Sequence, residues 1–277
     1  MERVFHEVPL TLFTHSIHWP NGSRLLRRAA WVASLVLPLA LTAVPAQALD
    51  PAPATPSVAL QGTSLPIPNP LFPLSHPIGQ QRLIESSYRQ AYFPLATYFE
   101  TQRNQAYCSV ATSVMALNAL GVTRPVTALY PDYRFFTQQD FFAGVDPRIA
   151  RPEVVEREGM TLEQLGSVLA FQPVRAELVF ADTLNVSQLR QLLMKHLREQ
   201  DRFVLFNFNR RIIGEEGGGH WSPLAAYHEA SDSALVMDVA RYKYPPMWMP
   251  LADLLRSAQD HDSVSGKARG LIVLSGR

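Results

Sequence analysis

The spacing of hydrophobic residues changes along the chain, from helical periodicity in the first part to short apolar runs in the second. Helical spacing is found at residues 83–92, 108–120, 162–169 and 189–197. Thr161 and Gln164 predict a capping box for the third of these helices, and Asn185 or Ser187 is expected to cap the fourth. We therefore expect four amphipathic helices, each with one buried stripe.

Apolar runs bounded by glycine, aspartate, serine or charge predict strands at 203–208, 223–228, 234–240 and 270–275. Between the helical segments, residues 122–144 are rich in aromatic side chains and interrupted by proline. This segment is interpreted as packed loop with short helical turns, its rings belonging to the core. Helices followed by an antiparallel sheet indicate a single α+β domain.

The first 48 residues have the pattern of a secretory signal peptide. Arg24, Arg27 and Arg28 precede an apolar run at 29–44, and Ala46-Gln47-Ala48 supplies a small-residue cleavage site. A membrane anchor is the alternative, but the run contains Pro38 and is shorter than the ~20 residues that a membrane span needs. We predict cleavage after Ala48 and an exported, periplasmic or secreted protein with no stable membrane insertion.

Residues 50–77 are rich in proline, which favours extended structure over helix or central strand. We interpret residues 49–77 as a linker, or an arm lying on the domain, and 78–277 as the catalytic domain.

Composition excludes several classes of protein. The 277 residues are 47% hydrophobic, which suffices for a sizeable core, and the formal net charge of +1 without a basic run argues against nucleic-acid binding. A single cysteine excludes an intrachain disulfide and a zinc site built from cysteine pairs. The histidines form no HxxxH or HExxH pair, so a metalloenzyme has no local signature.

That single cysteine, Cys108, stands at the start of the predicted helix 108–120. Unpaired N–H groups and the helix dipole would favour the thiolate and lower the pKa of the thiol, as in a nucleophile. The alternative is a buried cysteine that acts as a small hydrophobe. Gln102, six residues earlier, is either a surface glutamine or a donor to an oxyanion hole.

A base and its orienting group follow downstream. His220 comes after three glycines, and Asp238 lies in the apolar run 234–240, where a carboxylate needs a partner. His220 could instead be solvated, and His228, near the turn, is expected to be exposed. The turn between the two strands is centred two residues too late to pair His220 with Asp238, so a bulge or uneven loop is required.

Asp238 has a structural alternative as well. It could form an ion pair with Arg241 or Lys243 rather than orient a histidine. The spacing of residues leaves this open.

Three segments resemble one enzyme family: YCSVATSVMALNAL at 107–120, GHWSPLAAYH at 219–228 and DVARYKYPPMW at 238–248. They are similar to phytochelatin synthases, of the papain-like cysteine peptidase clan, and the resemblance runs over about 80–274. It implies a papain-like fold, with the nucleophile helix packed on the sheet. It implies that Cys108 is the nucleophile, His220 the general base and acid, Asp238 its orienter and Gln102 the oxyanion donor.

The resemblance also implies a substrate. Family members attack glutathione, release glycine and hold a γ-glutamylcysteinyl thioester. Water then gives γ-Glu-Cys, whereas a second glutathione, usually as a heavy-metal thiolate such as that of cadmium, gives phytochelatin. No resident cofactor is implied. The implied pocket residues are Asn207, Gly219, Asp262 and Arg269, with Arg241 and Tyr244 around the second substrate.

Two departures bear on the activity. The chain ends soon after the last predicted strand without the cysteine-rich region of eukaryotic members, which leads us to expect a short form that favours hydrolysis. Ser109 and Trp221 replace a glycine and a phenylalanine common in the family. A peptidase or amidase acting on another envelope peptide and a non-catalytic thiol or metal-glutathione binding protein stay as alternatives. The sequence leaves a homodimer open.

Overall fold

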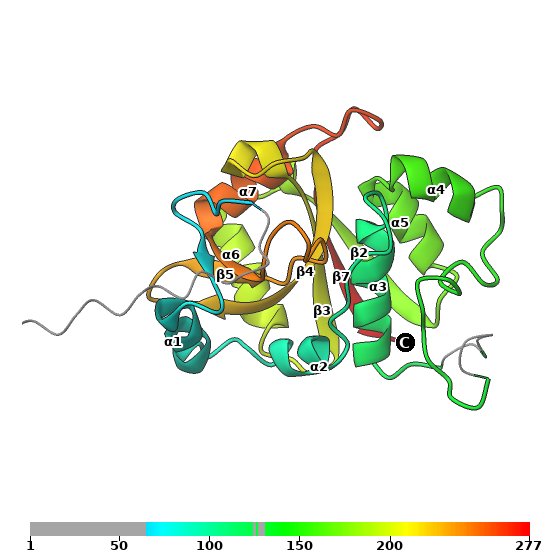
Figure 1. Cartoon of the computed structure of the whole chain (residues 1–277), viewed down its shortest axis with the longest axis horizontal. Coiled ribbons are helices and arrows are strands. Elements are labelled where there is room, and N and C mark those ends of the chain that lie inside the picture. The colour runs from blue at the N-terminus through cyan, green and yellow to red at the C-terminus, as the bar shows by residue number, and fades with distance from the viewer. Residues whose placement is uncertain (1–64, 124–125, 127–130) are drawn as a thin grey trace, which may run out of the picture. The chain divides into compact units, whose positions relative to one another are not determined.

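The computed structural model describes residues 65–123, 126 and 131–277. The predicted signal peptide and most of the proline-rich segment lie outside these residues. Within the described part, seven strands form one antiparallel sheet in the order β1-β6-β5-β4-β3-β7-β2 (Figure 1). The strands are β1 (Phe72–Pro73), β2 (Val174–Phe180), β3 (Arg202–Asn209), β4 (Gly219–His228), β5 (Ser233–Val236), β6 (Met247–Pro250) and β7 (Gly270–Gly276).

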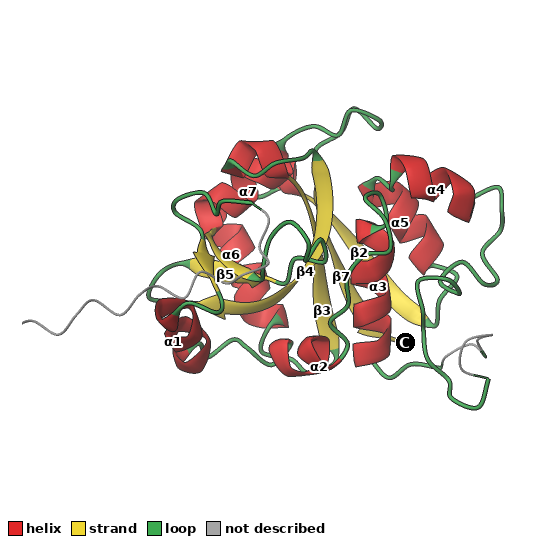
Figure 2. Cartoon of the chain, in the orientation of Figure 1, coloured by secondary structure: helices red, strands yellow, loops and turns green. Residues whose placement is uncertain are grey.

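Helices surround this sheet (Figure 2). They are α1 (Pro77–Glu85), α2 (Tyr92–Thr97), α3 (Cys108–Ala119), α4 (Pro152–Glu158), α5 (Leu162–Leu169), α6 (Val186–His196) and α7 (Leu251–Gln259), with 3₁₀ turns η1 (Ala181–Thr183) and η2 (Arg210–Ile213). Helix α3 packs on β4 and β3, α5 packs on β2 and β7, and α6 and α7 pack on each other and on β3. The predicted α+β class is confirmed.

Helix α3 begins at Cys108, as predicted, but its burial differs from the prediction. Every residue from Cys108 to Asn118 is buried, rather than a single stripe. A helix that is apolar all round belongs in the interior of a protein. The polar side chains on α3 are short, and one of them, Ser113, donates from Oγ to the Ser109 carbonyl 2.8 Å away. Helix α3 therefore lies within the core.

Both predicted caps are confirmed. Thr161 and Gln164 form a reciprocal capping box at the start of α5, and Asn185 forms the equivalent box with Gln188 at the start of α6. The Asn185 side chain occupies the N-cap position, which decides between the two predicted capping residues of α6. Local side-chain chemistry therefore defines where these two helices begin.

Other boundaries were predicted less well. The helix expected over 83–92 is wrong in extent, because α1 ends at Glu85 and Tyr88 instead forms an isolated bridge with Tyr227. The strand expected over 234–240 ends at Val236. Six of the described helices and strands were not predicted: β1, α2, β2, α4, β6 and α7. In the segment 122–144, Phe136, Phe141 and Phe142 are buried as expected, whereas Tyr133 is exposed.

The end of the proline-rich segment belongs to the sheet edge. Phe72 and Pro73 pair with Trp248 and Met247 of β6, and Leu71 is buried. Residues just before the predicted domain start at Ile78 thus lie on the domain, as an arm would, although the boundary itself stays a prediction. Among the described residues, no helix is both long and apolar enough to cross a membrane.

Candidate active site

The sulfur of Cys108 lies at the N-terminus of α3. Backbone N–H groups of Trp221 and Ser109 form hydrogen bonds with it, and it senses the charges of Arg210 and Asp238. Burial nevertheless dominates and raises the pKa of the Cys108 thiol above its ordinary value. The expectation of a lowered pKa is therefore wrong for the free protein, because desolvation of the thiolate outweighs the N–H groups that favour it.

His220 and Asp238 are in direct contact. His220 Nε2 lies 3.0 Å from Asp238 Oδ1, and both side chains are buried. Ser222 Oγ lies 3.0 Å from the same nitrogen. An anionic carboxylate only accepts hydrogen bonds, so Nε2 carries the proton and Nδ1 holds the lone pair of the neutral ring. The alternative of a solvated His220 is wrong.

The contact depends on an irregularity in the sheet. Strands β4 and β5 pair in one register from His228 to Ala226, and the register shifts between Ala226 and Leu224. This is the bulge that the spacing required. Asp238 then follows the end of β5 and reaches His220 at the opposite end of β4 from the turn.

The electrostatic surroundings set the charge states of His220 and Asp238. Burial and the neighbouring Arg210 lower the pKa of His220 to about 4, so its ring is neutral at pH 7. Burial alone would raise the pKa of Asp238, but the attraction of His220 and Arg210 outweighs it and lowers that pKa to about 2. The site therefore combines a neutral imidazole with a permanently charged carboxylate.

Arg210 is the partner of Asp238 that the sequence did not reveal. Its Nη2 donates to Asp238 Oδ1 and Oδ2 at 2.9 and 2.7 Å, and its Nη1 donates to Glu215. All three side chains are buried. The predicted alternative, an ion pair of Asp238 with Arg241 or Lys243, is replaced by this one.

Glu215 completes the buried network. Burial raises the pKa of its carboxyl to about 7, against the attraction of Arg210. The guanidinium of Arg210 lies over the ring of Tyr244, 5.2 Å from its centroid. No spacing rule links Arg210 or Glu215 to Asp238, and only the need of a buried aspartate for a cation pointed to such a partner.

Gln102 is buried near these residues, 4% exposed. Its backbone N–H donates to the Val239 carbonyl at 2.9 Å, which joins it to the segment after Asp238. Its side-chain Nε2 donates to the Asn104 carbonyl at 2.7 Å and to the Tyr242 hydroxyl at 3.1 Å. The alternative of a surface glutamine is wrong, and its role as an oxyanion donor stays a prediction.

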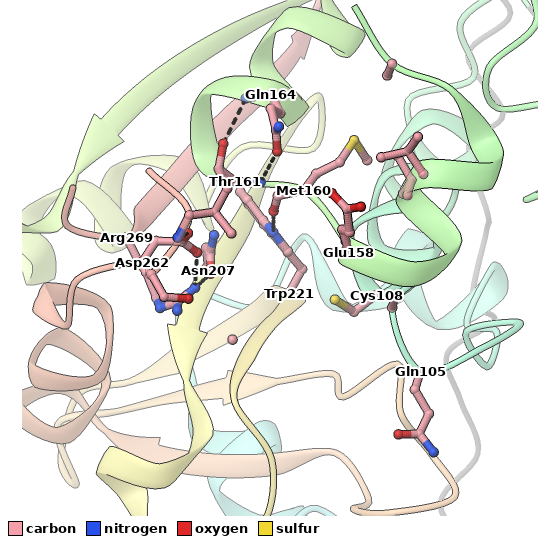
Figure 3. A pocket seen from close by; sticks show the side chains of 18 of the residues that line it. Gln105, Cys108, Glu158, Met160, Thr161, Gln164, Asn207, Trp221, Asp262 and Arg269 are labelled. Atoms are coloured by element: carbon pink, nitrogen blue, oxygen red, sulfur yellow. Dashed lines mark hydrogen bonds and ion pairs between the residues drawn. The ribbon is translucent and has the colours of Figure 1, made fainter. Parts of the chain in front are cut away.

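Cys108 opens onto a cleft of about 280 Å³ (Figure 3). Trp221 forms part of its wall, held by a 2.9 Å hydrogen bond from its indole N–H to the Met160 carbonyl. Four of the predicted substrate residues also line this cleft: Asn207, Gly219, Asp262 and Arg269. Helix α4 and the residues around it, which were not predicted, supply the wall beside Glu158 and Arg151.

The four predicted substrate residues form one cluster. Arg269 Nη1 donates to Asp262 Oδ2 at 2.7 Å and to Asn207 Oδ1 at 3.3 Å, as the dashed lines in Figure 3 indicate. A Cβ at Gly219 would lie 2.5 Å from the same nitrogen. A side chain at position 219 would therefore force the guanidinium to move, so Gly219 provides more than freedom of the loop.

Two further predicted substrate residues lie elsewhere. Tyr244 is buried, and its hydroxyl accepts a hydrogen bond from the Glu216 N–H at 2.8 Å. Arg241 is exposed and lies over the ring of Phe99, 4.8 Å from its centroid. Neither lines the cleft. Their assignment to a second substrate stays a prediction.

His228 lies outside the site, as expected, but is not exposed. It is buried at the far end of β4, with Nδ1 2.8 Å from Ser231 Oγ and its ring against Trp248. In the part of the chain that the structure describes, no group of three or more His, Cys, Asp or Glu side chains is placed to hold a metal ion.

Comparisons with known proteins agree on one family. The sequence model of phytochelatin synthase matches residues 63–271. A glutathione γ-glutamylcysteinyltransferase 1 of Lotus japonicus is 29% identical over 192 residues, which cover 69% of this chain and 37% of that protein. The Arabidopsis thaliana protein of the same name is 28% identical over 220 residues, covering 78% and 44%.

A glutathione γ-glutamylcysteinyltransferase of Schizosaccharomyces pombe is 27% identical over 195 residues, which cover 70% of this chain and 45% of that protein. The chain thus spans less than half the length of these curated relatives. The matched region 63–271 contains the Cys108 helix, the His220–Asp238 pair and the Arg269 cluster. The chain therefore belongs to the phytochelatin synthase family.

Proposed function

We propose that this protein is a thiol enzyme that cleaves glycine from glutathione through a γ-glutamylcysteinyl thioester on Cys108. The observation that carries this is the cleft itself, in which the thiol and the Arg269 cluster line one space. His220, in contact with Asp238, directly precedes the cleft residue Trp221 in β4. The names of the relatives, glutathione γ-glutamylcysteinyltransferases, support the substrate and the transferred group.

The first half-reaction uses the neutral thiol and the neutral imidazole. His220 Nδ1 takes the thiol proton as Sγ attacks the carbonyl carbon of the Cys-Gly amide. A tetrahedral oxyanion forms, and Gln102 donates to it. The C–N bond then breaks, His220 returns the proton to the leaving amine, and glycine departs. Asp238 stabilises the imidazolium that exists between these two proton transfers.

The second half-reaction releases the acyl group. His220 takes a proton from water or from the amine of a second glutathione, which attacks the thioester, and Cys108 leaves and recovers a proton. Water gives γ-Glu-Cys, and the amine gives phytochelatin. We propose that hydrolysis predominates, that a heavy-metal glutathione thiolate can serve as the acceptor substrate, and that Arg241 and Tyr244 act toward this second substrate.

Two buried donors support recognition of a carboxylate at the Arg269 end. Arg269 Nε and Asn207 Nδ2 have no hydrogen-bond partner among the described residues. The nearest acidic oxygen to Arg269 Nε, on Asp260, is 3.8 Å away, beyond hydrogen-bond distance. Buried donors are normally satisfied, so a ligand with acceptor oxygens fits here. The α-carboxylate of the glutamyl residue supplies two of them.

Incubation of the purified protein with glutathione, with and without cadmium, tests the proposal. We expect free glycine and γ-Glu-Cys in both cases, with longer oligomers only where an acceptor competes with water, all resolved by mass spectrometry. A Cys108→Ala protein that still released glycine would refute the role of the thiol. Cleavage of cell-wall peptides with glutathione left intact would favour a different peptidase.

Two further features belong to the proposal. We propose a papain-like arrangement, in which the nucleophile helix packs on the sheet that carries the base, and export after cleavage at Ala48. Expression of the full chain in a bacterial host, followed by N-terminal sequencing of the exported protein, tests the second. We expect Leu49 as its first residue, and an uncleaved membrane-bound chain would contradict it.

A further inference from the structure

The side-chain amide of Gln102 is held from its nitrogen only. Its Oε1 is buried and has no hydrogen-bond partner among the described residues, whereas Nε2 donates to the Asn104 carbonyl at 2.7 Å and to the Tyr242 hydroxyl at 3.1 Å. A glutamine amide has two N–H donors, and these contacts use both. The direction of the amide therefore depends on two acceptors. One is the backbone carbonyl of Asn104 and the other is the side-chain hydroxyl of Tyr242.

Tyr242 comes from the segment after Asp238 and reaches back over the site. Tyr242 is 39% exposed, and its hydroxyl is close enough to Cys108 for the charge of a thiolate to raise its pKa, although burial has the larger influence. The hydroxyl that accepts from Gln102 Nε2 is therefore also within electrostatic reach of the thiol. Tyr242 was not among the site residues predicted from the sequence.

The two hydrogen bonds of Gln102 Nε2 differ in length and in the kind of acceptor. The shorter bond, to a backbone carbonyl, fixes the position of the amide. The longer bond, to a neutral hydroxyl, holds the second N–H and can be exchanged for a stronger bond to a charged oxygen. An amide that two hydrogen bonds hold in place in advance needs little reorientation when an oxyanion develops within its reach.

From this geometry we propose that Tyr242 is a positioning residue, whose hydroxyl orients the Gln102 amide as the oxyanion donor for acyl transfer to Cys108. This inference rests on the proposed function only in taking acyl transfer as the reaction. It requires no particular substrate, so it can be tested without glutathione.

Acetylation of Cys108 by p-nitrophenyl acetate provides the test. Sγ attacks the ester carbonyl, a tetrahedral oxyanion forms, the C–O bond breaks and p-nitrophenolate leaves with the electron pair. Alkylation of the same sulfur by iodoacetamide displaces iodide and forms no oxyanion. The ratio of the two rates therefore reports on the oxyanion donor and cancels changes in thiol reactivity.

For Tyr242→Phe we expect acetylation to slow by about fivefold, the effect of one hydrogen bond, with alkylation unchanged. In a Gln102→Ala background, Tyr242→Phe should have no further effect on acetylation, because the amide it orients is gone. Tyr133→Phe is the matched control, since Tyr133 is 74% exposed, and it should change neither rate.

Three outcomes would overturn the inference. Unchanged acetylation in Tyr242→Phe would show that the hydroxyl does not matter. Equal slowing in the presence and absence of Gln102 would show that it acts without the amide. A parallel fall in acetylation and alkylation would place the effect on the thiol. The wild type and its variants could show the expected acetylation rates while the wild type releases no glycine from glutathione. In that case the proposed function fails and the role of Tyr242 stands.

Discussion

Arg210 binds both oxygens of Asp238, at 2.9 and 2.7 Å, while Asp238 Oδ1 also lies 3.0 Å from His220 Nε2. The carboxylate that orients the proposed base is thus itself fixed by a guanidinium. The Ala240 N–H adds a third donor to Oδ1, at 2.7 Å. With its oxygens held in this way, Asp238 can turn neither away from His220 nor toward solvent.

Removal of this cation should be severely destabilising. In Arg210→Met, Asp238 would be left as a buried carboxylate without its cationic partner and Glu215 would lose a hydrogen bond, and we expect a loss of about 3–5 kcal/mol in the free energy of unfolding. Urea denaturation followed by circular dichroism measures it. Arg190→Met is the matched control, because Arg190 also donates two hydrogen bonds to one carboxylate, from Nε and Nη2 to Asp232, but with side chains 35% and 41% exposed.

For that exposed pair we expect a loss of about 1 kcal/mol or less. Equal losses in the two variants would contradict the importance of burial.

Glu215 should make the stability of the protein depend on pH. Its pKa is raised from 4.5 to about 7 in the folded protein, so the folded state holds a proton that the unfolded state has released. This contribution is fully present below pH 4.5 and is lost as the pH rises toward about 7. Glu215→Gln, which stays neutral, should therefore gain stability relative to the wild type across this interval.

Urea titrations of both proteins at several pH values measure the difference. A stability difference that stays constant with pH would show that Glu215 keeps an ordinary pKa.

The resting thiol should be unreactive at neutral pH. Burial raises the pKa of Cys108, and burial lowers the pKa of His220 to about 4. The thiol and the imidazole are therefore both neutral at neutral pH. The rate of iodoacetamide alkylation, followed by mass spectrometry, should keep rising with pH into the alkaline range. A plateau that extends from neutral pH down into the acid range would instead indicate a preformed thiolate–imidazolium pair.

Gly219 should be required for substrate binding. A Cβ at this position would lie 2.5 Å from Arg269 Nη1 and displace it from Asn207 and Asp262. We expect Gly219→Ala to raise the KM for glutathione by about tenfold or more, since a charge-assisted hydrogen bond is lost, with a smaller change in kcat.

Gly218→Ala provides the control, because a Cβ at Gly218 would meet nothing within 4 Å. Similar kinetics in the two variants would argue against binding at the Arg269 cluster.

Local signals in the sequence sufficed for part of this structure. The capping box of α5, the N-cap of α6 and the start of α3 depend on residues a few positions apart, and they were predicted correctly, with Asn185 as one of two candidates for the cap of α6. Helix α7 was missed although its apolar residues have helical spacing. Strand β2 was missed because it is only partly buried and charged residues interrupt its apolar pattern. Such elements are defined by what they pack against.

The candidate site divides in the same way. The need of a buried carboxylate for a partner predicted that Asp238 is paired, the family resemblance favoured His220 as that partner, and residue counting required an irregularity such as the bulge near Ala226. The pKa of Cys108 was wrongly predicted because helix polarity can be read from sequence, whereas burial cannot. Arg210 was missed because 28 residues separate it from Asp238 with no motif between them.

Complete burial of α3 from Cys108 to Asn118 has a consequence for how this fold can diversify. The sulfur sits at the end of a helix that cannot shift without disturbing the core on every side. The opposite walls of the cleft, by contrast, include exposed residues such as Arg151, Glu158 and Val264. We therefore expect substitutions in these outer walls to change what the cleft binds, whereas the position of Cys108 is constrained by the core around α3.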